Sequence, residues 1–219
     1  MDKPLEWTSF DVVNKVRNLI GRKTKVGHAG TLDPLATGLL ILCTGKKTKQ
    51  IEAIQAGEKE YLATVRFGAT TASYDAEEPE ENPIDATHLS AAAVEDALSL
   101  FTGELQQRPP AFSAVKVKGK RAYALARQGQ APEVPPRTVH IHALELVSFA
   151  SPRQVVLRVV CGKGTYIRSL AHDLGQHLGV GAYLGALRRT RIGTHLVEDA
   201  LTPEAFAERL GRATQQTNP

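Results

Sequence analysis

The sequence predicts an α+β protein in which a mixed β-sheet is accompanied by helices. Some segments alternate apolar and polar residues, as strands do, and others carry apolar residues at helical spacing. These segments follow one another irregularly, without the strict alternation of strand and helix that marks a doubly wound parallel fold. The chain has 219 residues, of which 42% are hydrophobic and 23% charged, so it is long enough for one full domain with a core.

The first forty residues predict a helix, a loop and a strand. Thr8 or Ser9 caps a helix with apolar residues at helical spacing, and Gly21 ends it. A loop punctuated by glycines follows over residues 27–38. The apolar run 39–43 has the length of a short buried strand.

The middle of the chain predicts a strand, an acidic loop and two helices. Alternating apolar side chains indicate a strand over residues 61–68. Residues 77–83 form an acidic surface loop, and an amphipathic helix occupies residues 91–101. A shorter helix is expected over residues 123–128, after a loop that contains two prolines.

The last third predicts two strands and two helices. Residues 139–149 and 154–161 read as strands on either side of a turn. A helix with one apolar face runs over residues 166–178. Thr202, followed by a proline and an acid, opens a final helix that extends to about residue 210.

The net charge is only +4, but the charges are segregated along the chain. Residues 14–50 hold eight bases and one acid, and residues 105–140 hold seven bases and one acid. Between them, residues 72–104 hold nine acids and no Lys or Arg. Each run alone suits a solvated surface, whereas several basic runs together favour a polyanionic partner such as RNA or DNA. A last basic group consists of Arg188, Arg189 and Arg191.

Several classes of protein are disfavoured. No apolar stretch approaches the roughly 18 residues of a membrane span, and the N-terminus lacks the apolar region of a secretory signal. Cys43 and Cys161 lie in separate apolar segments and suit two reduced core thiols, which indicates a cytoplasmic protein. The seven histidines have no carboxylate or cysteine set around them, so no metal site is expected.

Two segments resemble phosphate-binding loops without matching them. For residues 45–48, Leu40 stands where the leading glycine of such a loop belongs, and Lys47 stands where its Ser or Thr belongs. Residues 162–165 have a glycine directly after the lysine. Nucleoside triphosphate binding is therefore disfavoured. A serine hydrolase is also disfavoured, because no serine lies in a G-x-S-x-G elbow.

The densest candidate for chemistry is the loop 27–38. Its three glycines permit close backbone approach, and Pro34 stiffens the chain directly after Asp33. A single carboxylate among bases tends to stay ionised, and a fixed ionised carboxylate can act as a nucleophile or a general base. The same pattern also suits an ordinary turn in which Asp33 bonds only to nearby backbone, so the residues alone leave both interpretations open.

This loop, GHAGTLDPLATGLL, resembles the signature segment of the bacterial tRNA pseudouridine-55 synthase (TruB) family. Further blocks resemble the family in the same order along nearly the whole chain. Within one of them, residues 71–75, Ala72 stands where the family usually has aspartate. The other matching blocks are residues 2–12, 59–61, 109–116, 162–168 and 187–189.

The resemblance implies a cofactor-free isomerase that converts one uridine, position 55 in the TΨC arm of tRNA, to pseudouridine after flipping it out of the RNA. By motif position Asp33 would be the nucleophile. Tyr61 would stack on the uracil and take part in proton transfer, and Arg168 would pair with Asp33. The remaining roles implied are His28 at the mouth of the site, Tyr166 and Leu187 lining the uracil pocket, and Lys3 and Pro4 buttressing it.

The resemblance also implies a pseudouridine synthase fold, with a mixed, largely antiparallel central sheet flanked by helices and loops. The catalytic domain is expected over residues 1–210, with a family-specific insertion at 72–138 and a polar tail at 211–219. The C-terminal RNA-binding (PUA-type) domain of many members is expected to be absent. The expected partner is the tRNA TΨC stem-loop, with no membrane and no small-molecule cofactor, and the expected oligomeric state is a monomer.

Two alternatives stay open. A non-catalytic module could grip or fold tRNA without needing Asp33 for chemistry. A guide-RNA-dependent pseudouridine synthase, from the sister branch of the superfamily, would need a guide RNA and protein partners.

Overall fold

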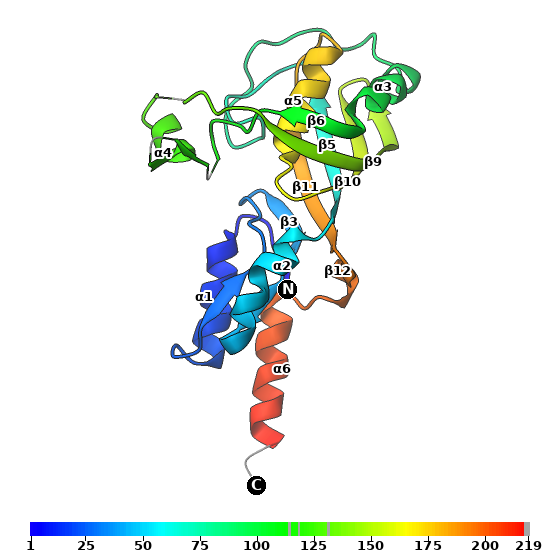
Figure 1. Cartoon of the computed structure of the whole chain (residues 1–219). Coiled ribbons are helices and arrows are strands. Elements are labelled where there is room, and N and C mark those ends of the chain that lie inside the picture. Colours follow the sequence, from blue (N-terminus) through cyan, green and yellow to red (C-terminus); the bar gives the residue numbers. More distant parts are fainter. Residues whose placement is uncertain (114, 118, 131, 217–219) are drawn as a thin grey trace. The chain divides into compact units, whose positions relative to one another are not determined.

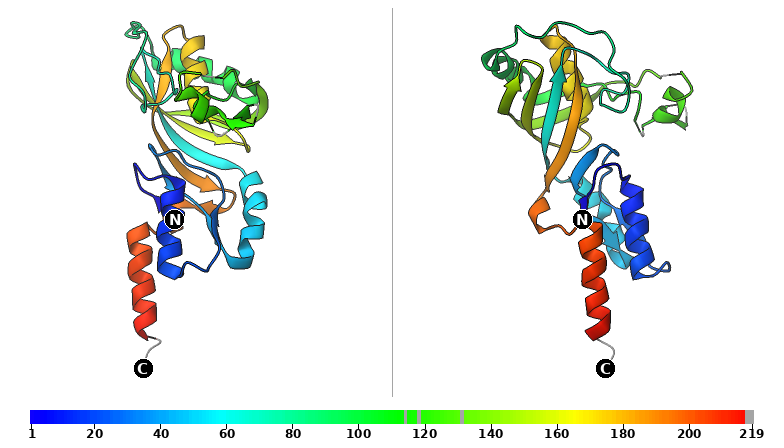
Figure 2. Two further views of the ribbon diagram at one scale, coloured as in Figure 1. Left: turned by 90° about the vertical axis from the view of Figure 1, so that its left-hand side faces the viewer. Right: turned by 180° about the vertical axis from the view of Figure 1, so that it is seen from behind.

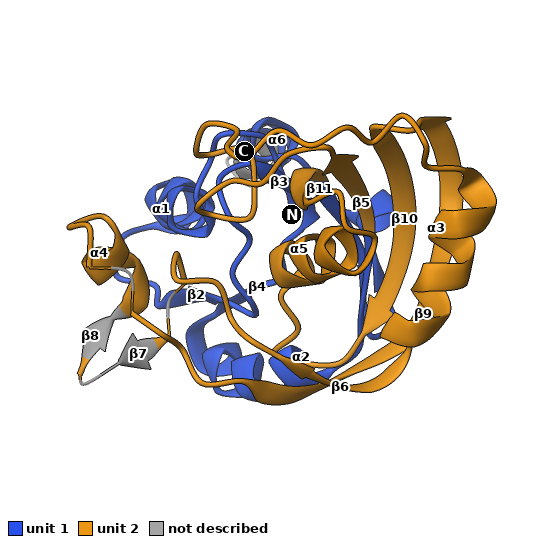
Figure 3. Ribbon diagram, turned by 90° about the horizontal axis from the view of Figure 1, so that it is seen from above, with its two compact units in different colours: residues 1–61, 187–219 blue, residues 62–186 orange. Residues whose placement is uncertain are grey.

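The computed structural model describes residues 1–113, 115–117, 119–130 and 132–216. It divides into two compact units (Figure 3). Unit 1 comprises residues 1–61 and 187–219, and unit 2 comprises residues 62–186. Ala114 and Lys118, which belong to a matching block and to a basic run, lie outside the described residues, as does the end of the predicted tail, 217–219.

Unit 1 is built around short strands and three α-helices. The first helix begins with a reciprocal capping box, in which the Thr8 hydroxyl accepts from the Asp11 N–H and the Asp11 carboxylate accepts from the Thr8 N–H. The last helix packs against the first (Figure 2). The elements of unit 1 are β1 (Asp2–Lys3), α1 (Ser9–Ile20), β2 (Val26–His28), β3 (Ala36–Leu39), β4 (Leu42–Thr44), η1 (Gly45–Gln50), α2 (Ile51–Ala56), β12 (His195–Leu196), η3 (Val197–Asp199) and α6 (Pro203–Gln216).

Unit 2 contains a long antiparallel hairpin with helices packed against it (Figure 1). The helix after the acidic loop packs against β9 and contacts α5. The elements of unit 2 are α3 (Ala91–Leu98), η2 (Ser99–Phe101), β6 (Gly103–Gln107), β7 (Lys116–Val117), β8 (Lys120–Arg121), α4 (Ala122–Ala126), β9 (Arg137–Ser151), β10 (Gln154–Cys161) and α5 (Ile167–His177). Two strands, β5 (Lys59–Phe67) and β11 (Ala182–Ile192), contribute residues to both units.

The main sheet has eight strands in the order β1-β3-β11-β5-β10-β9-β6, and β12 pairs with β11 outside this path. The pairings β1–β3, β10–β9 and β6–β9 are antiparallel, whereas β3 and β11 are parallel. The predicted α+β class with a mixed, largely antiparallel sheet is therefore confirmed. Alternate residues of β5 are buried, which is the pattern that the sequence predicted.

Most of the predicted elements are confirmed, and three predictions are wrong. The apolar run 39–43 is not one strand, because β3 ends at Leu39 and β4 begins at Leu42. The final helix continues past residue 210 to Gln216, so the polar tail begins inside a helix. The strand β11 was not predicted, since its basic residues were interpreted as a surface group. Among the described residues, no helix is both long enough and apolar enough to span a membrane.

Candidate active site

The loop that carries Asp33 has its backbone fixed on both sides of the carboxylate. The buried Ser9 hydroxyl donates to the Leu32 carbonyl at 3.1 Å and accepts from the Leu32 N–H at 2.8 Å. The Ala36 N–H donates to the Asp33 carbonyl at 3.0 Å. Asp33 itself is partly exposed to solvent. The loop thus presents a carboxylate whose main chain is anchored to helix α1.

Lys3 is a buried cation that contacts the backbone of this loop. Its side chain has no exposed surface, and Nζ donates to the carbonyls of Pro4 at 2.9 Å, Trp7 at 2.5 Å and Pro34 at 3.3 Å. Burial lowers the pKa of Lys3 to about 8, and this shift is opposed by the negative charge of Asp33. Lys3 therefore holds the backbone directly after Asp33 and interacts electrostatically with its carboxylate.

Arg189 holds the other side of the same loop. It is 2% exposed, and its guanidinium donates to the carbonyls of Leu39 at 2.7 Å, Gly30 at 3.1 Å and Thr31 at 3.5 Å. The planar fork of an arginine suits several carbonyl acceptors at once. This role of Arg189 was not predicted, because the sequence gives no local signal that one arginine of this group is fully buried.

The other predicted residues of unit 1 lie on elements around this loop. His28 ends β2, and burial, reinforced by the charge of Arg189, lowers the pKa of its imidazole, which is therefore neutral at pH 7. Tyr61 is buried on the inward face of β5. Leu187 pairs with Ala36 in the parallel β11–β3 ladder. Ala36 comes three residues after Asp33 in the chain.

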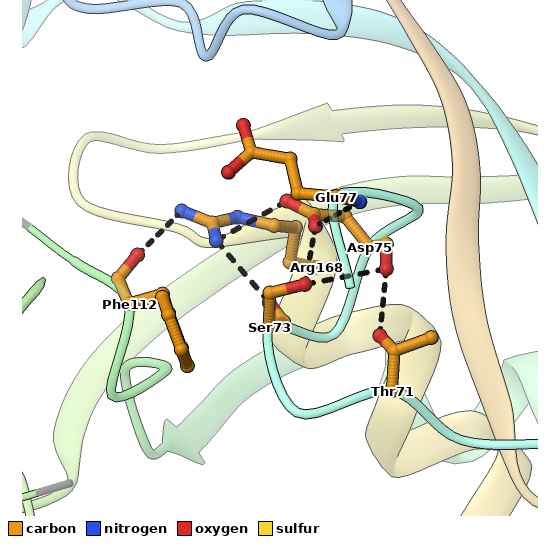
Figure 4. Close-up of polar contacts among 6 residues, drawn as sticks. All are labelled: Thr71, Ser73, Asp75, Glu77, Phe112 and Arg168. Carbon is orange, nitrogen blue, oxygen red and sulfur yellow. Dashed lines mark hydrogen bonds and ion pairs between the residues drawn. The ribbon is translucent and has the colours of Figure 1, made fainter. Parts of the chain in front are cut away.

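Arg168 lies in the first turn of α5 in unit 2 and is 6% exposed. Figure 4 shows its polar contacts. Its guanidinium lies 3.3 Å from a carboxylate oxygen of Asp75, which is 4% exposed. It also donates to the carbonyls of Ser73 at 3.2 Å and Phe112 at 3.0 Å. Arg168 is therefore a buried helix arginine whose guanidinium is held by groups of its own unit.

Asp75 is in turn fixed by its own loop. The Ser73 hydroxyl donates to its Oδ1 at 2.5 Å, and the Glu77 N–H donates to the same oxygen at 3.0 Å. The Thr71 hydroxyl donates to the Asp75 carbonyl at 2.6 Å (Figure 4). A buried arginine with a carboxylate and two carbonyls has its charge compensated and its direction fixed. Asp75 was not predicted as a site residue, because it lies in no strand or helix pattern of the sequence.

The predicted site residues therefore form two groups, one in each unit. Asp33 and Arg168, which the resemblance pairs, belong to different units, so their pairing stays a prediction. Tyr166, the other predicted residue of unit 2, is the residue before helix α5. The unit 1 group contains Lys3, Pro4, His28, Asp33, Tyr61 and Leu187.

Most of the exposed lysines and arginines of unit 1 belong to the first basic run, residues 14–50. Its exposed members are Lys15, Arg22, Lys23, Lys25, Lys46, Lys47 and Lys49.

The predicted basic group of Arg188, Arg189 and Arg191 has hydrogen-bond partners within unit 1. Arg188 donates to both carboxylate oxygens of Asp2, at 3.0 and 2.8 Å. Arg191 donates to Glu58 at 2.6 Å, and Arg189 is buried. Two of these arginines thus pair with carboxylates of unit 1, and the third binds backbone carbonyls.

Two family models match this chain. A model described as "TruB family pseudouridylate synthase (N terminal domain)" matches residues 17–167. A model described as "tRNA pseudouridylate synthase B C-terminal domain" matches residues 168–218. A protein named tRNA pseudouridine synthase B from Phocaeicola vulgatus is 52% identical over 212 residues, covering 94% of this chain and 90% of that protein. The protein of the same name from Flavobacterium johnsoniae is 46% identical, covering 96% and 94% of the two chains.

Solved structures show the same fold. A chain in "Structure of H/ACA RNP bound to a substrate RNA containing 2'-deoxyuridine" matches with a TM-score of 0.74 and 26% identity, covering all of this chain and 54% of that one. A chain in "Crystal Structure of a Cbf5-Nop10-Gar1 Complex" matches with a TM-score of 0.67 and 32% identity, covering 88% and 47%. This chain thus spans about half the length of these solved chains.

Fold and sequence define the class of protein as a pseudouridine synthase, an isomerase. More particularly, the chain belongs to the TruB family of tRNA pseudouridine synthases. The expected family, fold and enzyme class are confirmed, whereas the roles of individual residues stay predictions.

Proposed function

We propose that this protein converts the uridine at position 55, in the TΨC arm of tRNA, to pseudouridine without a cofactor. Uridine and pseudouridine are isomers, so the reaction consumes no oxidant, reductant or group donor. The glycosidic bond from C1′ to N1 breaks and a bond from C1′ to C5 forms. The hydrogen on C5 leaves as a proton, and N1 takes up a proton, so that atoms and charge balance. The observation that carries the proposal is the anchored loop around Asp33 in a chain of this family.

Asp33 is the nucleophile in this proposal. A nucleophilic carboxylate must be ionised and must keep its direction while the substrate rearranges. The hydrogen bonds of Lys3 and Arg189 to the carbonyls of Pro34, Gly30 and Thr31 support the fixed direction. Such a nucleophile holds part of the substrate on the enzyme while the detached uracil rotates to present C5.

Arg168 assists Asp33 in this proposal by pairing with its carboxylate. Asp75 supports this role, because a neighbouring carboxylate and two carbonyls orient the guanidinium before substrate arrives. A cation in a buried setting interacts more strongly with a second carboxylate than one in water does.

Three aromatic or apolar side chains contact the uracil in this proposal. Tyr61 stacks on the flipped uracil and takes part in proton transfer, and Tyr166 and Leu187 line the pocket. Extruding a base from a folded RNA arm costs a few kcal/mol, and aromatic stacking recovers roughly 1–3 kcal/mol per base. A neutral His28 at the mouth stacks within the RNA loop without carrying a charge into it.

Phosphate contacts come from the exposed lysines and arginines of the first basic run, residues 14–50. Such contacts release counterions, so tRNA affinity falls steeply as salt rises. Filter binding of an unmodified tRNA between 50 and 300 mM KCl measures this slope. A slope near zero would show that these side chains are solvated surface and would remove the proposed RNA face.

The activity is tested with an unmodified tRNA transcript, with no guide RNA, metal or nucleotide added. Pseudouridine at position 55 alone, mapped by carbodiimide modification and primer extension, supports the proposal. A transcript in which this uridine is replaced by cytidine is the matched control and yields no product. Conversion only after a guide RNA is added would favour the sister branch, and binding without conversion would favour an RNA-binding module.

A further inference from the structure

The side chains of Gln107 and Arg137 contact Tyr166, and the proposed function gives neither of them a role. Tyr166 precedes helix α5 and has extended backbone angles, with φ −101° and ψ 111°, and its own side chain makes no capping hydrogen bond. Two residues that face each other across the β6–β9 ladder, Gln107 and Arg137, contact Tyr166 from two directions.

Gln107 fixes the main chain of Tyr166. Its side chain is 3% exposed; Nε2 donates to the Tyr166 carbonyl at 3.0 Å, and Oε1 accepts from the Tyr166 N–H at 2.7 Å. One amide thereby satisfies both backbone groups of the residue at the helix entrance. Next to it, the buried Ser169 hydroxyl donates to the Arg108 carbonyl at 2.7 Å, which fastens the same turn of α5 to the end of β6.

Arg137 fixes the ring of Tyr166. Its guanidinium carbon lies 4.7 Å from the ring centroid, within the range of a cation–π contact. The same guanidinium donates to the Gly164 carbonyl, two residues before Tyr166. Its Nε is buried and has no hydrogen-bond partner in the part of the chain that the structure describes.

We propose that Gln107 and Arg137 are positioning residues that hold the Tyr166 ring in the orientation needed at the uracil. This inference rests on the proposed function, because it takes Tyr166 as a wall of the uracil pocket. Arg137 belongs to a basic run and could instead serve only as a phosphate contact. The two roles differ in one respect: a positioning residue acts through the aromatic ring, and a phosphate contact does not.

A double-mutant cycle separates these roles. Arg137→Met is made in the wild type, in Tyr166→Phe, which keeps the ring, and in Tyr166→Leu, which removes it. The single-turnover rate constant at saturating enzyme and the tRNA Kd are both measured. Arg137→Met is expected to lower the rate constant about tenfold in the first two backgrounds and less than about twofold in Tyr166→Leu, with Kd changed less than about twofold.

Conservative and control variants complete the test. Arg137→Lys keeps the cation and is expected to recover to within about threefold of the wild-type rate. Arg158→Met removes one arginine of the same unit that pairs with Glu145, and is expected to leave the rate unchanged. Gln107→Met is expected to lower the rate constant in the same coupled way, provided that its circular dichroism spectrum matches the wild type.

The outcomes separate failure of the positioning role from failure of the proposed function. An equal loss in the Tyr166→Leu and wild-type backgrounds, or a loss confined to Kd, would overturn the inference and leave the proposed function standing. A wild-type enzyme that makes no pseudouridine would overturn the proposed function, and the inference with it.

Discussion

The guanidinium of Arg168 lies 3.3 Å from the carboxylate of Asp75, and both side chains are more than nine-tenths buried. Removing two charges from water is costly, and the cost is recovered only when the remaining hydrogen bonds are satisfied. Here Ser73 donates a hydroxyl to the carboxylate, and its carbonyl accepts from the guanidinium. The pair is thus a complete network, in which loss of one member leaves an uncompensated buried charge.

Asp75→Asn is therefore expected to destabilise the protein by about 3–5 kcal/mol, because Arg168 keeps its charge in a buried site. Urea-induced unfolding at pH 7 measures this loss. Glu145→Gln is the matched control, since it breaks the Arg158 pair on a largely exposed surface and is expected to cost less than about 1 kcal/mol. Equal effects of the two substitutions would contradict the role given to the buried pair.

Gly38 and Gly21 provide a second comparison. Both have positive φ, 102° and 101°, so alanine brings similar backbone strain at either position. At Gly21 a Cβ meets open space, whereas at Gly38 it would lie 2.3 Å from the Arg189 carbonyl oxygen. Gly38→Ala is expected to cost about 1–3 kcal/mol more than Gly21→Ala in thermal unfolding. Similar melting temperatures would mean that the β3–β11 approach is looser than described.

Lys3 provides a probe of the charge on Asp33. Burial lowers its pKa from 10.5 to about 8, and the carboxylate of Asp33 opposes this shift. In Asp33→Asn the pKa of Lys3 is therefore expected to fall below 8, which a pH titration of ¹³C-labelled lysines followed by NMR measures. Asp85→Asn, at an exposed carboxylate that bonds Thr87, is the control and leaves the Lys3 pKa in place. An unchanged pKa in Asp33→Asn would contradict the electrostatic link.

The same titration carries a stability prediction for Lys3. Its pKa is lower in the folded protein, so between pH 8 and 10.5 the unfolded chain binds more protons. Stability conferred through this group therefore rises with pH across that window, and Lys3→Met is expected to lack the rise. An equal rise in stability with pH in the wild type and in Lys3→Met would show that another group causes it.

Asp173 predicts a pH effect of the opposite sign. Burial raises the pKa of its carboxyl from 3.8 to about 6. Its contribution to stability is therefore fully present below pH 3.8 and is lost as the pH rises through 6. The side chain of Asp173→Asn cannot ionise. As the pH rises over this range, the free energy of unfolding of this variant is expected to increase relative to that of the wild type. The increase is less than about 3 kcal/mol because the site is partly exposed. A difference independent of pH in urea unfolding would refute this.

The sequence predicted best what is determined locally. The helix cap at Thr8 or Ser9 and the alternation along β5 arise from neighbouring residues, and both are confirmed, with Thr8 as the cap. The run 39–43 failed because its partners change within it. The Leu40 N–H donates to the Met1 carbonyl and the Ile41 carbonyl accepts from Ala29, so the strand path is interrupted between two pairings.

The parts of the site that were missed depend on distant contacts. Arg189 is buried because carbonyls about 150 residues away accept its hydrogen bonds, and no periodicity within β11 indicates this. Asp75 lies in a loop beside Tyr74, which has φ 64°, and its partner Arg168 is on a helix far along the chain. The loop around Asp33 was found because glycines, a proline and a single acid are adjacent in sequence.

The measurement that tests the central claim most directly is tritium release from a tRNA transcript labelled at C5 of its uridines. Wild type and Asp33→Asn are compared at equal tRNA occupancy, which filter binding establishes. The wild type is expected to release the label of one uridine per tRNA, and Asp33→Asn is expected to bind tRNA and release none. Release by Asp33→Asn at the wild-type rate would contradict the assignment of Asp33 as the nucleophile.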